Sequence, residues 1–162
     1  MKIIQLLSFM LLFTACVEER ETETAYTPVL MSRTDLETSI KVSSPRKINK
    51  AGKIYRAGNL LFINEKFEGV HVYNNASPSN PVALGFIDIP GNVDITIKGD
   101  IIYADNAVDL VSLRYENNTI KVLHRERNVF PEIVAPDMGS IPYDFTPDQR
   151  PANTVIVNWE KP

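Results

Sequence analysis

The sequence predicts an all-β fold, in which two four-stranded antiparallel propeller-type blades form an incomplete β-propeller with irregular N- and C-terminal segments. The chain repeats itself, because residues 57–72 and residues 98–113 carry similar sequences at a constant offset of 41 residues. Each copy contains four short β-type runs, and turn residues such as Gly58 and Gly99 separate the runs. Four strands in about 40 residues is the period of a propeller blade.

The composition is that of one globular domain. Of 162 residues, 44% are hydrophobic and 23% are charged, which is near the average for folded domains and excludes a disordered chain. The formal net charge is −3, and the bases form no stripe that could neutralise a run of phosphates. We therefore expect no nucleic-acid partner.

Residues 1–15 are predicted to be a lipoprotein signal peptide. Residues 3–13 are apolar except for Gln5 and Ser8, and this run is too short for the roughly 20 residues of a membrane-spanning helix. The run leads into "FTAC", which ends in the single cysteine of the chain, Cys16, and resembles the signal of bacterial lipoproteins. The resemblance implies cleavage before Cys16, acylation of its thiol and attachment to a membrane through the lipid. The alternative is an inert cysteine behind an ordinary export signal.

Residues 16–50 are predicted to form an acidic tether and a short helix. The stretch "VEERETETAYTP" is polar and acidic without apolar periodicity, which is typical of a solvated tether or plain spacer. Acidic residues after a lipidated cysteine also resemble the signal that directs lipoproteins of the Bacteroidetes group to the outer face of the outer membrane. We therefore expect a lipid-anchored protein of the bacterial outer membrane, either exposed on the surface or facing the periplasm. Thr34 and Glu37 resemble a capping box that begins a helix through Ile40.

Residues 51–91 are predicted to form the first blade and residues 92–130 the second. The predicted strands are residues 53–57, 59–64, 69–73 and 82–89 in the first blade and residues 93–98, 100–105, 109–115 and 119–125 in the second. Runs such as "LLFI" and "IIYA" lack the alternation of a sheet with one wet face, which predicts burial on both faces by stacking of neighbouring blades. Residues 131–162 form a Pro-rich C-terminal segment that ends in a strand, "TVIVNW", with no local partner.

Two strand motifs, a turn and a hairpin follow one another at fixed offsets in residues 69–113. The strands read "GVHVY" and "LVSLR", the turn reads "ASPSNP" and the hairpin reads "IKGDIIYAD". This pattern resembles the LVIVD-repeat family of bacterial surface lipoproteins, which have propeller-like folds. The resemblance implies a fold and an envelope location, and it carries no catalytic residues. Because a ring needs about four to eight blades, two copies predict a shortened or N-terminal part of a family member, self-association to complete a ring, or flanking segments that cover the open faces.

Four residues are predicted to form a binding rim. Asn64, Glu65, Asp105 and Asn106 follow the second strand of each copy, so propeller geometry places them on one rim, where the loops of repeat proteins bind. The alternative is that they are β-turn formers. We expect no catalytic residues, no metal site and no cofactor, because the two histidines lie at non-equivalent positions and no zinc or calcium spacing is present.

These features predict a membrane-anchored cell-envelope lipoprotein that acts as a non-enzymatic interaction module of β-propeller type. Its predicted partners are the membrane, through the lipid on Cys16, and an unknown protein or glycan. Two alternatives come from other classes: an envelope hydrolase or lyase with a site at the blade centre, and a purely structural envelope component. The enzyme needs convergent acid and base groups, which the two histidines and the turn carboxylates do not provide.

Overall fold

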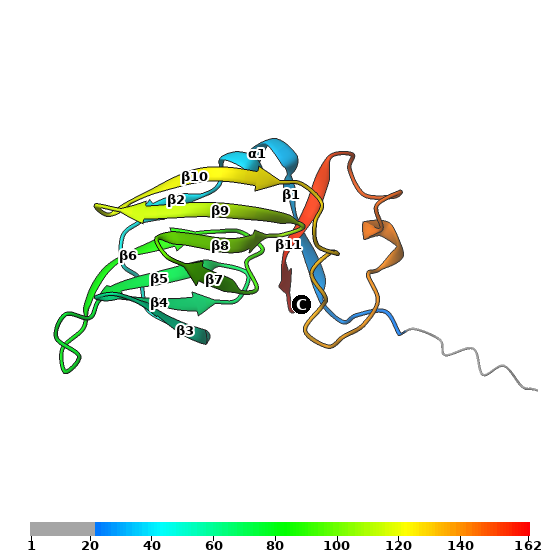
Figure 1. Ribbon diagram of the computed structural model, residues 1–162. Coiled ribbons are helices and arrows are strands. Elements are labelled where there is room, and N and C mark those ends of the chain that lie inside the picture. The colour runs from blue at the N-terminus through cyan, green and yellow to red at the C-terminus, as the bar shows by residue number, and fades with distance from the viewer. Residues whose placement is uncertain (1–21) are drawn as a thin grey trace, which may run out of the picture.

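The computed structural model describes residues 22–162 as an all-β protein with three antiparallel sheets, none of which closes on itself (Figure 1). The first sheet has the strand order β2-β6-β5-β4-β3, the second has the order β10-β9-β8-β7, and the small sheet pairs β1 with β11. The first sheet consists of β2 (Lys41–Ser43), β3 (Ala51–Ala57), β4 (Leu60–Glu65), β5 (Gly69–Asn74) and β6 (Val82–Asp88). The other elements are β7 (Ile95–Lys98), β8 (Ile101–Asn106), β9 (Asp109–Glu116), β10 (Thr119–Glu126), β1 (Thr27–Ser32), β11 (Thr154–Glu160), helix α1 (Arg33–Thr38) and the 3-10 helix η1 (Tyr143–Phe145). The predicted signal peptide and Cys16 lie outside the described residues.

All eight strands predicted for the two repeats are present as β3 to β10, with ends that differ by at most two residues. The turn glycines Gly58 and Gly99 both have positive φ, 58° and 65°, a conformation that glycine adopts without steric cost. The first sheet has five strands where the sequence predicts four, because β2 pairs with the edge of β6 that faces away from β5. Val42 of β2 packs against the main core, so burial of apolar surface holds this segment in the sheet.

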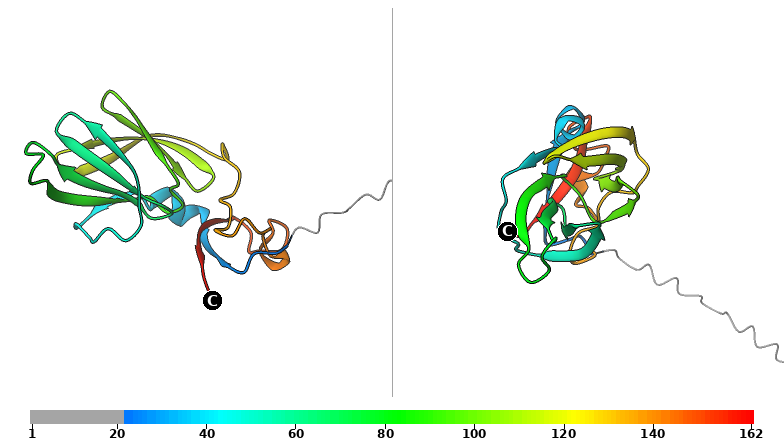
Figure 2. Two further views of the ribbon diagram at one scale, coloured as in Figure 1. Left: turned by 90° about the horizontal axis from the view of Figure 1, so that it is seen from below. Right: turned by 60° about the vertical axis from the view of Figure 1, so that its left-hand side comes forward.

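The segment before the repeats is more ordered than the predicted tether. β1 lies within residues 16–50, begins at the end of the predicted tether stretch (residues 17–28), and pairs antiparallel with β11 from Thr27, opposite Glu160, to Ser32, opposite Thr154. The final strand therefore has a partner at the other end of the described chain, which no local pattern reveals. The small sheet and the C-terminal segment sit at one end of the two larger sheets (Figures 1 and 2).

Helix α1 begins earlier and ends earlier than predicted. The hydroxyl of Ser32, rather than Thr34, caps it by accepting a hydrogen bond from the backbone amide of Asp35 at 3.1 Å. The helix ends at Thr38, and Ile40, which directly precedes β2, packs against the main core.

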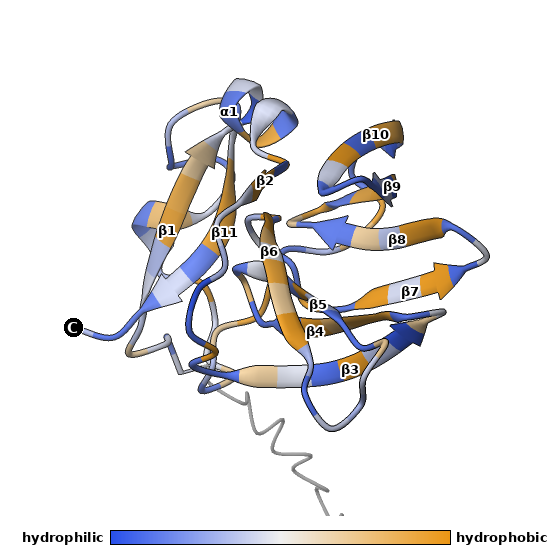
Figure 3. Cartoon of the chain, turned by 90° about the vertical axis from the view of Figure 1, so that its left-hand side faces the viewer, coloured by the Kyte–Doolittle hydropathy of each residue, from blue (hydrophilic) through white to orange (hydrophobic). Residues whose placement is uncertain are grey.

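The main core lies between the first and second sheets. Phe62 and Val72 of the first sheet belong to the same buried cluster as Ile102 and Leu113 of the second sheet. Figure 3 shows hydrophobic segments on the strands of both sheets. The predicted burial of both faces is confirmed for these inner faces only, because outer-face residues such as Leu61 and Tyr103 are only partly buried.

Equivalent strands of the two sheets bury opposite faces. Leu60 and Phe62 of β4 pack into the core between the sheets. The residues 41 positions further on, Ile101 and Tyr103, alternate with the buried Ile102 and lie on the outer face of β8. The two sheets are therefore stacked front to back, which is how neighbouring members of a repeat array stack.

The repeat offset changes at the tip of the central hairpin. In the first sheet Glu65 pairs with Gly69 across a loop of three residues, whereas in the second sheet Asn106 pairs with Asp109 across a loop of two. The constant offset of 41 is therefore wrong for the third strand of each copy. By strand register, the residue of the second sheet that is equivalent to Val70 is Leu110, which is 40 positions further on.

Candidate functional site

The predicted rim residues of the first sheet are buried at the end of β4. Asn64 is 2% exposed, and its side-chain amide donates a hydrogen bond to the carbonyl of Val93 at 2.9 Å. The carboxylate of Glu65 accepts hydrogen bonds from the backbone amides of Asn49 and Lys50 at 3.1 and 3.0 Å, and it also bonds to the ring of His71. Glu65 therefore holds the segment before β3 against the sheet.

The environment of Glu65 keeps its carboxyl charged. Burial raises the pKa of Glu65, but the hydrogen bonds from His71 and from the amides of Lys50 and Asn49 outweigh burial and hold the pKa below its ordinary value. His71 is itself buried and packs edge-on against Phe86, with ring centroids 4.7 Å apart. A carboxylate in this setting is a structural anion whose oxygens are all engaged.

The predicted rim residues of the second sheet hold the connection between the sheets. Asp105 accepts hydrogen bonds from the backbone amides of Val93 and Asp94 at 2.6 and 2.8 Å, and burial raises the pKa of Asp105. Asn106 is fully buried, donates to the carbonyl of Pro90 at 2.7 Å and accepts from Arg125 at 2.8 Å. Both side chains fix residues 90–94, which carry the chain from β6 to β7.

The four predicted residues do not line one open rim. Asn64 and Asp105 meet through the backbone of Val93, whereas Glu65 and Asn106 face separate partners. Their hydrogen bonds are those of turn and segment clamps. That these residues bind a ligand stays a prediction, and most of their polar atoms already make hydrogen bonds within the protein.

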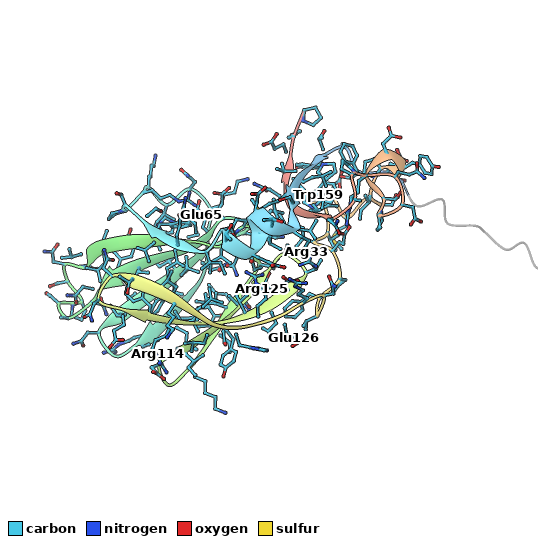
Figure 4. The ribbon with its side chains drawn as sticks, turned by 90° about the horizontal axis from the view of Figure 1, so that it is seen from above. Arg33, Glu65, Arg114, Arg125, Glu126 and Trp159 are labelled. Atoms are coloured by element: carbon cyan, nitrogen blue, oxygen red, sulfur yellow. The ribbon has the colours of Figure 1, made fainter. Side chains whose placement is uncertain are left out.

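A buried charge cluster lies next to the rim residues, and the sequence reasoning missed it. The carboxylate of Asp109 is fully buried and accepts hydrogen bonds from Arg33 of α1 at 2.6 Å, from Arg125 of β10 at 2.8 Å and from the amide of Asn128 at 3.1 Å. Figure 4 shows Arg33 and Arg125 side by side next to α1. Burial raises the pKa of Asp109, and the bonds from Arg33, Asn128 and Arg125 more than reverse this. The sequence signal was absent because Arg33 and Asp109 are 76 residues apart.

The two histidines differ in exposure and in the sheet to which they belong. His71 is buried in the first sheet, whereas the side chain of His124 is 71% exposed on the second sheet. Within residues 22–162, no group of three or more histidine, cysteine, aspartate or glutamate side chains is arranged to hold a metal ion. No helix among the same residues is long and apolar enough to cross a membrane.

A cleft of about 660 Å³ opens where the first sheet meets the small sheet. Its walls come from five separate parts of the chain: Tyr26, the segment before β3, the β4–β5 hairpin, Pro136 and the C-terminal residues. Its cationic lining residues are Arg46, Lys47, Lys50, Lys66 and Lys161. The only sequence signal for it is the short basic stretch "RKINK" before β3.

The acidic side chains of the cleft are already engaged. Glu65 is the buried clamp described above, and Glu68 bonds to Arg46 at 3.1 Å and accepts from the side-chain amide of Asn158 at 3.4 Å. The guanidinium of Arg46 lies 3.4 Å from the ring centroid of Phe86, which fixes its position. The cleft therefore presents an excess of positive charge to any group that enters it.

A second hollow, of about 590 Å³, lies on the outer face of the second sheet. Tyr103 and Leu110 of the sheet and Phe130, Ile133 and Val134 of the following segment line it. Its lining is mainly apolar, in contrast to the cationic cleft.

Comparisons with known proteins add no family. No protein-family model matches the chain, and searches of curated proteins and of solved structures find no match either.

Proposed function

We propose that this chain is a membrane-anchored cell-envelope lipoprotein, held by a lipid on Cys16, that acts as a non-enzymatic binding module of propeller type and belongs with the LVIVD-repeat proteins. The observation that carries the proposal is the front-to-back stacking of two meanders with the same strand order. Repeat proteins of this kind use their loops and end faces to bind partners, and their scaffold supplies rigidity.

The connection between the sheets supports the propeller-type reading. The chain leaves β6 and crosses back to start β7 against β3, so both meanders begin on the same side of the stack. Tyr55 of β3 donates a hydrogen bond to Asp94 at 2.7 Å, and Lys53 of β3 pairs with the same carboxylate. The first strand of the second meander, β7, therefore lies next to the first strand of the first meander, β3, as the first strands of consecutive propeller blades do.

The binding role is favoured over hydrolysis or lyase chemistry by the state of the polar side chains. The buried acids and His71 are engaged in internal hydrogen bonds that clamp segments, and His124 stands apart from them. A general acid or base needs a free position near a reacting atom. The cationic cleft, by contrast, offers binding groups in a site of ordinary ligand size.

Membrane fractionation of the full chain tests the anchor. We expect the wild type in the membrane fraction with label from radioactive fatty acid, and we expect Cys16→Ser to be unlabelled and released from the membrane. An unlabelled wild type, or a Cys16→Ser variant that stays in the membrane, would contradict the lipoprotein. Protease treatment of whole cells then separates surface exposure from a periplasm-facing position.

Self-association to complete a ring is the second candidate, and the outer face of the first sheet favours it. Ile54 is 63% exposed, and Leu61, Ile63 and Tyr73 on the same face are only partly buried. Their equivalents in the second sheet are Ile95, Ile102, Ala104 and Leu113, all of which are buried against the first sheet. The first sheet thus repeats the apolar pattern that the second sheet uses for stacking.

A mixing experiment tests head-to-tail stacking of copies. Ile63→Lys should block the outer face of the first sheet, Tyr103→Lys should block the outer face of the second, and each variant alone should lose association. Because such a contact is heterologous, an equal mixture should form dimers and nothing larger, as measured by light scattering. A wild type that stays monomeric at high concentration would rule out the ring.

A further inference from the structure

The cleft at the end of the first sheet has positive charge that the protein itself does not neutralise. Lys47, Lys50, Lys66 and Lys161 line it, and none of the four is in an ion pair among the residues the structure describes. Glu68, the one cleft carboxylate that is partly exposed, pairs with Arg46. The chain has more acidic than basic residues, yet basic side chains are concentrated in this cleft.

The backbone that carries two of these lysines is fixed in place. Glu65 accepts hydrogen bonds from the amides of Asn49 and Lys50, and Arg46 is held between Phe86 and Glu68. The loop is thus ordered before any ligand arrives. A preordered cationic loop loses less conformational entropy on binding than a mobile one.

Aromatic and amide groups accompany the cations. Tyr26, Phe67 and Trp159 line the cleft, and the ammonium group of Lys66 lies 4.8 Å from the ring centroid of Phe67. Trp159 is only 6% exposed, and its indole N–H donates to the carbonyl of Ile133 at 3.1 Å, so it lies at the base of the cleft, whereas Tyr26 and Phe67 are partly exposed and offer ring surface to a ligand. The side chain of Asn49 supplies a donor and an acceptor.

This combination matches the chemistry of one ligand class. Sugar rings have apolar faces that pack on aromatic side chains, hydroxyls that bond to amides, and, in acidic sugars, anionic groups that bond to lysine and arginine. A volume of about 660 Å³ accommodates an oligosaccharide of a few rings. We infer that the cleft binds an acidic glycan, a carbohydrate that carries carboxylate or sulfate groups. The inference rests on the proposed binding function and names its ligand class.

Trp159 makes the test direct, because it is the only tryptophan of the chain and it lines the cleft. The full chain, purified in detergent, is titrated with trigalacturonate and with a chondroitin sulfate hexasaccharide while Trp159 fluorescence and binding heat are recorded. Maltotriose is the neutral control, and a tri-glutamate peptide represents an acidic protein segment. We expect at least one acidic glycan to bind and to change the fluorescence, and we expect its affinity to fall as salt screens the charges.

Charge variants identify the cleft as the site. Lys50→Gln with Lys66→Gln should weaken glycan binding about tenfold, since each exposed charge pair contributes a small factor. Glu68→Gln removes the opposing carboxylate and frees Arg46, so it should tighten binding about threefold. Lys98→Gln with Lys121→Gln changes two exposed lysines of the second sheet and should leave binding unchanged.

Three results would overturn the inference. They are no binding of either acidic glycan at millimolar concentration, equal binding of maltotriose, and tighter binding of the tri-glutamate peptide than of the glycans. A double lysine variant that binds as the wild type does would move the site elsewhere and also defeat it. None of these results changes the outcome of Cys16→Ser fractionation, so the ligand class and the proposed lipoprotein function fail separately.

Discussion

The tips of the two central hairpins occupy equivalent places in the two sheets, and they hold their surroundings by different chemistry. In the first sheet, Glu65 binds two backbone amides and His71. In the second sheet, Asp109 binds two arginines. Both carboxyl groups have a pKa below the ordinary value, and in both cases hydrogen bonds outweigh burial. Each tip is therefore an anion that docks a segment from outside the repeat.

The difference teaches how one backbone unit is specialised. The position equivalent to Asp109 is Gly69 in the first sheet, where φ is 138° and a Cβ atom would lie 2.1 Å from the carbonyl oxygen of Ile87. The position equivalent to Glu65 is Asn106 in the second sheet, which bonds to Arg125. The acid is thus on one side of the hairpin in the first sheet and on the other side in the second. The position of the acid determines which segment binds to the hairpin: the loop before β3 binds to Glu65, and helix α1 binds to Asp109 through Arg33.

Copying the second tip into the first should have the largest effect. Gly69→Asp forces a side chain into the backbone of β6 at a φ that favours glycine, and it buries a second carboxylate near Glu65. We expect a loss of about 5 kcal/mol or failure to fold, because steric overlap with backbone cannot relax cheaply. Urea unfolding followed by circular dichroism measures the loss. Gly99→Asp is the matched control, since a Cβ atom there meets nothing within 4 Å, and a similar loss in that turn variant would refute the steric explanation.

Removing the anion of the second tip should have the next largest effect. Asp109→Ala leaves Arg33 and Arg125, whose side chains are 20% and 12% exposed, without their shared partner. Breaking a buried ion pair on one side costs about 3–5 kcal/mol. Urea unfolding should show that loss, together with faster hydrogen exchange in α1, because Arg33 is the first residue of that helix. A loss below about 1 kcal/mol would mean that the cluster is solvated and that α1 is held by its apolar contacts alone.

The repeats were predictable from the sequence because their signals are local. Apolar runs separated by Gly58 and Gly99 place each strand within a few residues of its partner, and turn chemistry fixes the hairpins. The pairing of β1 with β11 and the bond between Arg33 and Asp109 connect residues that are far apart in the chain. Such contacts leave no periodic pattern in one sequence. The cleft was missed for the same reason, since five separate segments build it.

Acid should remove the stabilisation that the carboxylates of Glu65 and Asp109 provide, and variants with a neutral side chain should show how much each carboxylate contributes. The pKa values of Glu65 and Asp109 are lowered in the folded state, so each contributes stability above its unfolded pKa, about 4, and this stability is lost as pH falls through the folded pKa. The raised pKa of Asp105 acts in the opposite direction, because its contribution is present at acid pH and is lost as pH rises through the folded pKa. Glu65→Gln and Asp109→Asn should each lower stability at pH 7 by about 2 kcal/mol and flatten its fall between about pH 5 and 2. An unchanged pH dependence in both variants would assign the acid sensitivity to other carboxyls.

The smallest effect should come from an ion pair that resembles the second tip but lies in solvent. Asp100 and Arg114 approach to 2.8 Å on the outer face of the second sheet, and their side chains are 69% and 41% exposed. Although the Nε atom of Arg114 is itself shielded, both side chains are largely in water, so the pair gains little free energy and the loss of one partner costs little. Asp100→Asn should therefore change the free energy of unfolding by no more than about 0.5 kcal/mol at low and at high salt. Asp109→Asn is the matched buried variant, and its larger loss reflects burial together with the second arginine and the backbone amide that Asp109 also binds. Equal losses in the two variants would show that burial does not distinguish the hairpin tip from the surface.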